Sequence, residues 1–219
     1  MASEQRELHF NFQARYFRAG TLNAKTRRVW ILLHGYGQLA QYFLRKFQVL
    51  ENDHTFLLAP EGLSRFYLSE LTDVGRKDNK VGATWMTREN REMDILNYLA
   101  YLNEMIHQEL KGFEHVPVTI LAFSQGCATA CRWVAEGTVN FDRLILWAGL
   151  FPPDIDFSSA GRILQNKKTI LVVGDQDPFL TPARMVEFDA LAQKLGISPE
   201  KVVFPGKHEV REDVLLSLV

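Results

Sequence analysis

The segment VTILAFSQGCATACRWVAE, residues 118–136, places one serine between two apolar runs and decides the fold of the chain. Its first five residues are almost continuously apolar, as expected for a strand covered on both faces, and its last ten are compatible with a helix. Ser124 therefore falls on a tight strand-to-helix turn, which Ala122 and Gly126 leave room to close. Such a turn exposes a serine hydroxyl above the edge of a parallel sheet. We predict that Ser124 is a nucleophile, the alternative being a serine that only caps the helix.

Four more apolar runs have the length and composition of buried strands; they cover residues 29–33, 55–59, 144–148 and 169–173. Thr181 and Pro182 are a favourable start for a helix that runs to about Leu195. A longer helix is predicted over residues 89–110, where apolar side chains recur every three or four residues, at Met93, Leu96, Leu99, Leu102, Ile106 and Leu110. Strands alternating with helices indicate an α/β fold, in which a mostly parallel central sheet has helices on both faces.

The first 28 residues follow a different pattern, in which apolar and polar side chains alternate. Apolar side chains stand at Leu8, Phe10 and Phe12, and then at Tyr16 and Phe17, which predicts antiparallel strands at an edge of the sheet. No internal repeat, low-complexity segment or flexible linker divides the sequence. We therefore expect a single domain over residues 1–219.

The composition is that of a globular protein and excludes several classes of function. Hydrophobic residues make up 47% of the chain, and 25 basic against 26 acidic residues give a net charge of -1, without the basic excess that nucleic-acid binding needs. No apolar run approaches the ~20 residues of a membrane-spanning helix, and the N-terminus lacks the pattern of a secretory signal. We expect a cytoplasmic monomer or homodimer with no nucleic-acid partner and no integral membrane association.

The two cysteines are four residues apart within one apolar stretch. A helix would bring Cys127 and Cys131 near one face, and their spacing matches no common metal-binding pattern. We predict that both are reduced core residues, with a regulatory thiol pair as the alternative.

Two stretches do not fit the regular alternation of strands and helices. Residues 61–88 are mixed in polarity, and residues 150–167 contain consecutive prolines, Pro152 and Pro153. Both leave the carboxyl ends of predicted strands, where ligands bind in open α/β sheets. They are predicted to line a pocket, the alternative being solvated connections.

A second candidate site follows the apolar run at residues 29–33. His34 is followed by Gly35, Tyr36 and Gly37, and glycines at this spacing let the main chain turn so that backbone N–H groups point at an anion. Beside a nucleophilic serine, that anion would be the oxyanion of a tetrahedral intermediate. The N–H groups of Tyr36 and of Gln125, the residue after the serine, are the candidate donors; the alternative is an ordinary glycine turn.

A serine nucleophile on this scaffold needs an acid and then a histidine further along the chain, each just past a strand. The run at residues 169–173 is followed by two carboxylates, Asp175 and Asp177, and His208 follows a short apolar run at residues 202–204. Asp177 is preferred as the acid, because Asp175 lies next to the strand end and suits a turn-capping role. Ser124, Asp177 and His208 are thus the predicted catalytic residues.

The remaining histidines are predicted to have other roles. His34 would support the backbone of its loop, whereas His9, His54, His107 and His115 lie at predicted surface positions. No set of His, Cys, Asp or Glu has the spacing of metal ligands, and no dinucleotide or phosphate-binding loop is present. The sequence implies no metal and no cofactor.

The motifs of the preceding paragraphs occur in a family-specific order. HGYG at 34–37, AFSQG at 122–126, GDQDP at 174–178 and GKH at 206–208 resemble the phospholipase/carboxylesterase family of α/β-hydrolases, which includes the acyl-protein thioesterases. The resemblance extends from about Trp30 to the end of the chain and implies the α/β-hydrolase fold. It also implies a triad and an oxyanion hole made by the residues identified above.

Two positions depart from the family pattern. Ala122 stands where the family usually has glycine, and Lys207 stands in a run that is usually Gly-Met-Gly-His or similar. Residues 82–86 resemble the family's tryptophan-containing loop beside the acyl site, but the residues before them match poorly. Substrate preference is therefore the property that the resemblance transfers least.

These observations together predict a serine carboxylesterase that hydrolyses carboxylic ester or thioester bonds of a small-molecule or lipid substrate through an acyl-enzyme. Trp85, Phe179 and Leu180, apolar residues near strand ends, are predicted to bind the acyl group, the alternative being ordinary core packing. The alternative functions are a lipid hydrolase of the acyl-protein or lysophospholipid thioesterase type and a non-catalytic ligand-binding homologue.

Overall fold

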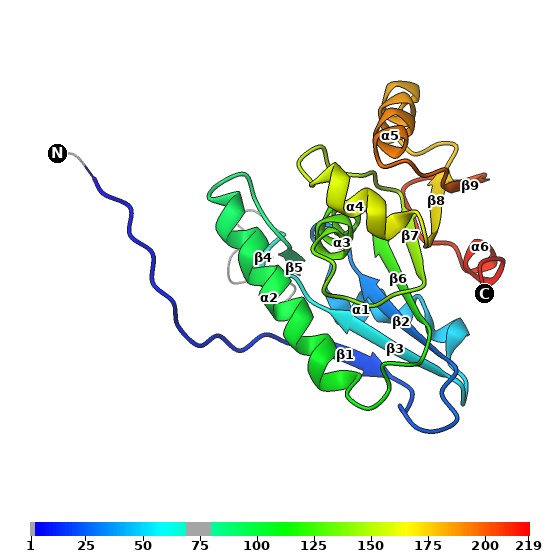
Figure 1. Ribbon diagram of the computed structural model, residues 1–219, viewed down its shortest axis with the longest axis horizontal. Helices are drawn as coiled ribbons and strands as arrows, with labels where there is room; N and C mark the ends of the chain where they lie inside the picture. The colour runs from blue at the N-terminus through cyan, green and yellow to red at the C-terminus, as the bar shows by residue number, and fades with distance from the viewer. Residues whose placement is uncertain (1–2, 69–79) are drawn as a thin grey trace.

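The computed structural model describes residues 3–68 and 80–219, and its centre is a seven-stranded sheet (Figure 1). The strand order is β1-β3-β2-β6-β7-β8-β9, with β1 antiparallel to β3 and the other neighbours parallel. The strands are Tyr16–Ala19 (β1), Arg28–Leu33 (β2), Thr55–Pro60 (β3), Val118–Phe123 (β6), Arg143–Trp147 (β7), Lys168–Gly174 (β8) and Glu200–Phe204 (β9). Ser64–Tyr67 (β4) and Val81–Thr84 (β5) form a separate antiparallel pair. The predicted α/β fold is confirmed.

Helices cover both faces of this sheet. One face packs against Arg91–Glu109 (α2), Gln125–Ala135 (α3), Phe157–Leu164 (α4) and Pro182–Lys194 (α5), and the other against Ala40–Arg45 (α1), the 3-10 helix Gln48–Leu50 (η1) and Glu212–Leu216 (α6). α2, α3 and α4 lie in front of the sheet in Figure 1. The predicted start of α5 is confirmed, because the Thr181 side chain accepts a hydrogen bond from the Arg184 N–H and Pro182 is the first helical residue.

The apolar strands are explained by burial on two sides. Along β2, Val29, Ile31 and Leu33 point into the core beneath α2–α5, while Trp30 and Leu32 point into the core beneath α1 and α6. All five side chains are fully buried. Because successive side chains of a strand point to opposite faces, a strand between two helical layers has no polar face, and the sequence pattern of alternation disappears.

The N-terminal prediction is only partly correct. β1 is an antiparallel edge strand, as expected, but Leu8, Phe10 and Phe12 belong to no strand and are exposed. Figure 1 shows this segment leading away from the body of the molecule. Alternation alone does not make a strand, since backbone N–H and C=O groups need a neighbouring chain to pair with.

The long helix α2 covers Arg91–Glu109, close to the predicted residues 89–110, but two of the apolar side chains that supported the prediction do not face the sheet. Met93 and Leu96 are exposed, whereas the side chains that face the sheet are Ile95, Tyr98, Leu99, Leu102 and Met105. The buried set follows a helical stripe with three- and four-residue steps. The helix carries more apolar residues than one stripe can contain, and contact with the sheet decides which of them are buried.

The cysteine prediction is confirmed. Cys127 and Cys131 are free thiols in the buried part of α3. Burial raises the pKa of both thiols, so each stays protonated and unreactive.

The two irregular stretches differ in structure. Within residues 61–88, positions 69–79 lie outside the described residues, and the rest contains β4, β5 and a segment leading to α2. Residues 150–167 contain α4. Their predicted pocket-lining role stays a prediction.

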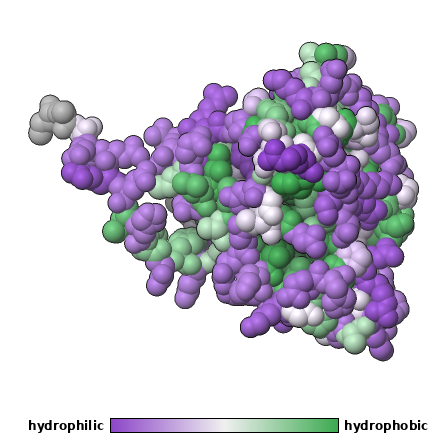
Figure 2. All heavy atoms as spheres, in the orientation of Figure 1, coloured by the Kyte–Doolittle hydropathy of each residue, from purple (hydrophilic) through white to green (hydrophobic). Residues whose placement is uncertain are grey.

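The face seen in Figure 2 is predominantly hydrophilic, with hydrophobic side chains showing across its middle. In the described part of the chain, none of the helices has the length and hydropathy that crossing a membrane needs.

The two-sided core predicts a large difference between two leucine-to-alanine substitutions. Leu171 in β8 is 0% exposed and Leu96 on α2 is 68% exposed. Leu171→Ala is expected to lower the free energy of unfolding by about 2–5 kcal/mol, because it removes buried surface and leaves a cavity. Leu96→Ala is expected to cost less than about 0.5 kcal/mol. Urea unfolding of the two variants measures both values, and similar losses would contradict the assigned faces of α2 and β8.

Candidate active site

Ser124 lies on a sharp turn between β6 and α3, with backbone angles φ 53° and ψ -117°. A positive φ is costly for a residue with a Cβ atom, so the surrounding structure must impose it. The Ser124 N–H donates to the Trp147 carbonyl at the end of β7, at 2.9 Å. On the other side, a Cβ at Gly126 would lie 2.6 Å from the Leu33 carbonyl oxygen, so α3 can begin this close to β2 only with glycine there.

A chain of two hydrogen bonds joins three side chains from three different loops. Ser124 Oγ lies 2.9 Å from His208 Nε2, and His208 Nδ1 lies 2.7 Å from Asp177 Oδ2. A carboxylate only accepts, so Nδ1 carries the proton and Nε2 can accept the proton of the serine hydroxyl. The side chain of Asp177 is 0% exposed and that of His208 is 21% exposed. The three residues predicted to act together are therefore brought within hydrogen-bonding distance.

The two aspartates that follow β8 have different partners. Asp177 uses its second oxygen, Oδ1, to accept the Phe179 N–H at 2.9 Å, which fixes the carboxylate that faces His208. Asp175 is exposed, and its Oδ1 accepts the Gly206 N–H at 3.0 Å. Asp175 thus ties the loop after β8 to the loop after β9, but it is Asp177 that bonds to the imidazole.

Two phenyl rings flank the imidazole. The ring centroid of Phe123 lies 4.9 Å from that of His208, and the ring centroid of Phe179 lies 4.8 Å from it in an edge arrangement. Phe123 directly precedes the serine and was not predicted as a site residue. The sequence did contain a signal for this contact, because Phe123 directly precedes Ser124. A turn that places the serine beside the base also places the last residue of the strand close to it.

The loop after β2 is closed by its own polar groups and by β5. Gln38 Oε1 accepts the Gly35 N–H at 2.9 Å, and the Gly37 N–H donates to the Ala83 carbonyl at 2.9 Å. Within residues 3–68 and 80–219, neither the Tyr36 N–H nor the Gln125 N–H donates to a protein acceptor.

His34 supports this loop from below, as predicted. It is fully buried, its Nδ1–H donates to the Gly35 carbonyl at 2.8 Å, and its Nε2 accepts the Gly62 N–H at 2.9 Å. Burial lowers the pKa of the imidazole, so it is neutral and both nitrogens have partners. The four histidines predicted at the surface are exposed: His9, His54, His107 and His115.

The three residues predicted to bind an acyl group occupy different environments. Trp85 is 2% exposed, stacks on the His34 ring with centroids 5.0 Å apart, and donates its indole N–H to the His34 carbonyl at 2.8 Å. Leu180 is partly buried against the cores on both faces of the sheet. Phe179 is exposed and contacts His208.

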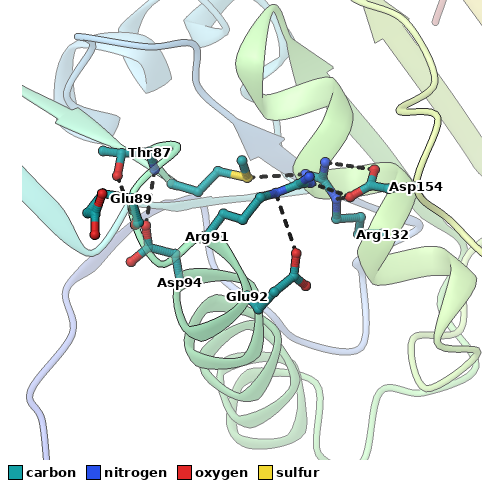
Figure 3. A network of polar contacts seen from close by, with 8 residues as sticks. Thr87, Glu89, Arg91, Glu92, Asp94, Arg132 and Asp154 are labelled. Atoms are coloured by element: carbon teal, nitrogen blue, oxygen red, sulfur yellow. Dashed lines mark hydrogen bonds and ion pairs between the residues drawn. The ribbon is translucent and has the colours of Figure 1, made fainter. Parts of the chain in front are cut away.

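A network of charged side chains connects the segment after β5 with the loop after β7 (Figure 3). Arg132 on α3 binds Asp154 through two hydrogen bonds, at 2.9 and 3.2 Å, and its third nitrogen contacts Met86 Sδ at 3.4 Å. Arg91 also binds Asp154. Burial opposes ionisation of Asp154, but the hydrogen bond and charge of Arg132 outweigh it and lower the pKa of the carboxyl group. Sequence reasoning missed this network, because nothing local links its members.

The chain is similar to a known family and to several solved structures. The family model described as phospholipase/carboxylesterase matches residues 21–218. Acyl-protein thioesterase 2 from Zea mays has a TM-score of 0.70 and 14% identity, covering 94% of this chain and 96% of that chain. The corresponding values are 0.67, 14%, 94% and 91% for a carboxylesterase from Bacillus cereus, and 0.66, 16%, 96% and 96% for a phospholipase/carboxylesterase from Dyadobacter fermentans. At these identities the structures share the fold. Comparison with curated proteins finds no matching sequence.

The strained turn predicts an unusual order of stability for two substitutions of one residue. With φ at 53°, Ser124→Gly relieves a strain of about 1–3 kcal/mol, more than the ~0.5–1 kcal/mol that glycine costs through its freer unfolded chain. Ser124→Ala keeps the strain. Urea unfolding should therefore show Ser124→Gly more stable than Ser124→Ala by about 1 kcal/mol; the reverse order would mean that the turn is relaxed.

Proposed function

The chain belongs to the phospholipase/carboxylesterase family of hydrolases, and from this premise we propose that it is a serine carboxylesterase that cleaves carboxylic ester or thioester bonds through an acyl-enzyme. The observation that carries the proposal is the hydrogen-bonded chain from Ser124 through His208 to the buried Asp177. A serine hydroxyl needs a base within reach to become a nucleophile, and the base needs a partner that fixes its tautomer.

In the proposed reaction Ser124 Oγ attacks the substrate carbonyl carbon while His208 Nε2 takes the serine proton. The imidazolium then returns this proton to the leaving alcohol or thiol as the bond to carbon breaks. A water molecule, activated by the same imidazole, hydrolyses the acyl-enzyme and regenerates the serine. Asp177 holds Nδ1–H toward itself and stabilises the transient imidazolium without taking the proton.

The developing oxyanion needs preorganised donors that point at the position its oxygen will occupy. The N–H groups of Tyr36 and Gln125 are proposed for this role, since neither is used by a protein acceptor in the described part of the chain. Two such donors would stabilise the tetrahedral intermediate more than the planar ester, which is the condition for raising kcat.

An apolar acyl group fits the surroundings of the site best. Tyr36, in the loop after β2, is 60% exposed, and Phe179, whose ring contacts the imidazole of His208, is 65% exposed. With Leu180 and Trp85 they are proposed to form the acyl-binding surface, in which Trp85 acts mainly by supporting His34. Both a small ester and a lipid ester or thioester would suit such a surface, so the length profile of the rate distinguishes a short-chain esterase from a thioesterase-type lipid hydrolase.

Covalent labelling tests the nucleophile. A fluorophosphonate probe is expected to modify Ser124, because its oxygen is beside a base and the residue, at the carboxyl end of β6, is only partly buried. Peptide mapping locates the label, and Ser124→Ala is the blank for rates on p-nitrophenyl esters of increasing acyl length and on one acyl thioester. Labelling of a different serine, or rates equal to the blank, would refute the proposal.

The two aspartates after β8 provide a matched pair of substitutions. Asp177→Asn should lower kcat by roughly 10⁴-fold, because an amide can force the wrong tautomer on His208. Asp175→Asn keeps an oxygen that accepts the Gly206 N–H, so it should retain most of the activity. Steady-state kinetics of both variants decide the assignment, which equal losses would contradict.

A further inference from the structure

The side chain of Gln125 makes hydrogen bonds that the proposed chemistry does not use. Its Nε2 donates to Thr84 Oγ1 at 2.9 Å and to the Met86 carbonyl at 3.0 Å, while its Oε1 accepts the Trp85 N–H at 3.2 Å. Thr84 and Trp85 are 3% and 2% exposed. The residue that offers one candidate oxyanion donor from its backbone is thus bonded by its side chain to the end of β5.

The backbone of residues 84–86 requires a carboxamide at this position. The Trp85 N–H needs an acceptor and the Met86 carbonyl needs a donor. Only one orientation of the Gln125 carboxamide, with Oε1 toward Trp85 and Nε2 toward Met86, satisfies both groups. The Thr84 hydroxyl accepts from Nε2 and donates to the Met86 carbonyl at 2.9 Å, which completes the arrangement. Glutamate would lack the donor, and methionine would lack both functions.

The same segment, residues 83–86, also holds the loop that carries the other candidate donor. The Gly37 N–H donates to the Ala83 carbonyl at 2.9 Å, and the Ala83 N–H donates to the Gln38 carbonyl at 3.1 Å, so these bonds lie just past Tyr36. The two backbones are in direct contact there, since a Cβ at Gly82 would lie 2.5 Å from the Gly37 oxygen.

We propose that the Gln125 carboxamide is a positioning group, which fixes the separation of the Tyr36 and Gln125 amides through residues 83–86. This inference rests on the proposed function and specifies how the two donors of its oxyanion hole are held at a constant separation. A hole made from two different loops needs a rigid connection between them, because a displacement of about 1 Å at a reacting group can cost roughly 100-fold in rate. The bonds from Ser124 to His208 and Asp177 involve none of these atoms, so nucleophile activation would survive loss of the carboxamide.

Gln125→Met tests the proposal, with Gln193→Met on the exposed face of α5 as the matched control. Gln125→Met should lower kcat on a p-nitrophenyl ester roughly 10- to 100-fold with little change in KM, because a displaced donor weakens transition-state binding. Thr84→Val is expected to lower kcat in the same direction, and Thr84→Ser should restore most of that loss, since it keeps the hydroxyl. The Thr84 pair decides the question if Gln125→Met does not fold.

A thionoester, with sulfur in place of the carbonyl oxygen, separates positioning from general destabilisation. Sulfur is larger and a weaker acceptor, so a preset oxyanion hole favours the oxygen ester. The ratio of oxygen-ester to thionoester rates should fall by roughly 5-fold or more in Gln125→Met and Thr84→Val, and stay at the wild-type value in Gln193→Met. An unchanged ratio, or an unchanged kcat, would overturn the positioning role. Wild-type rates equal to those of Ser124→Ala would instead overturn the proposed function, and this inference with it.

Discussion

The strained backbone of Ser124 is the constraint on which the rest of the site depends. A φ of 53° persists because β6 lies between β2 and β7 in the middle of the sheet, with all six of its residues buried. The turn cannot relax on the β7 side, where the Ser124 N–H is bonded to the Trp147 carbonyl, nor on the β2 side, where α3 begins against Leu33. The position of the hydroxyl is thus set by the packing of three strands. His208 and Asp177 come from loops after β9 and β8 and are placed relative to it.

A second set of constraints concerns buried polar groups around the loop after β2, residues 34–38. His34 is neutral, and its two nitrogens, its carbonyl and its ring each have a partner. Each of these groups would cost free energy if it were buried without one, so the loop has few alternative conformations. The carboxamide of Gln125 likewise provides partners for the Trp85 N–H and the Met86 carbonyl. The rigidity of the loop after β2 is therefore a consequence of its satisfied hydrogen bonds.

The ion pairs of the molecule differ in what they contribute. Glu61 has a side chain only 1% exposed, and it is compensated by Arg15, by Arg65 and by the Ala40 N–H at the start of α1. Removing a partner would leave a buried charge, which is costly. The exposed pairs at the surface contribute little, because water screens them. Glu61 thus joins the N-terminal segment to the region beside His34, and Arg132 with Asp154 joins the segment after β5 to the loop after β7.

The sequence by itself determined the α/β class, the strands before the site loops, the turn at Ser124 and the set of candidate side chains. Each of these follows from a local property, such as a run of apolar residues or a small residue beside a turn. Tertiary structure alone decided that Leu96 is exposed and Ile95 buried, and that Leu8 to Phe12 form no strand. It also decided that Phe123 lies on His208 and that Arg132 pairs with Asp154. These outcomes depend on which partners are close in space but distant in sequence, and local pattern does not contain that information.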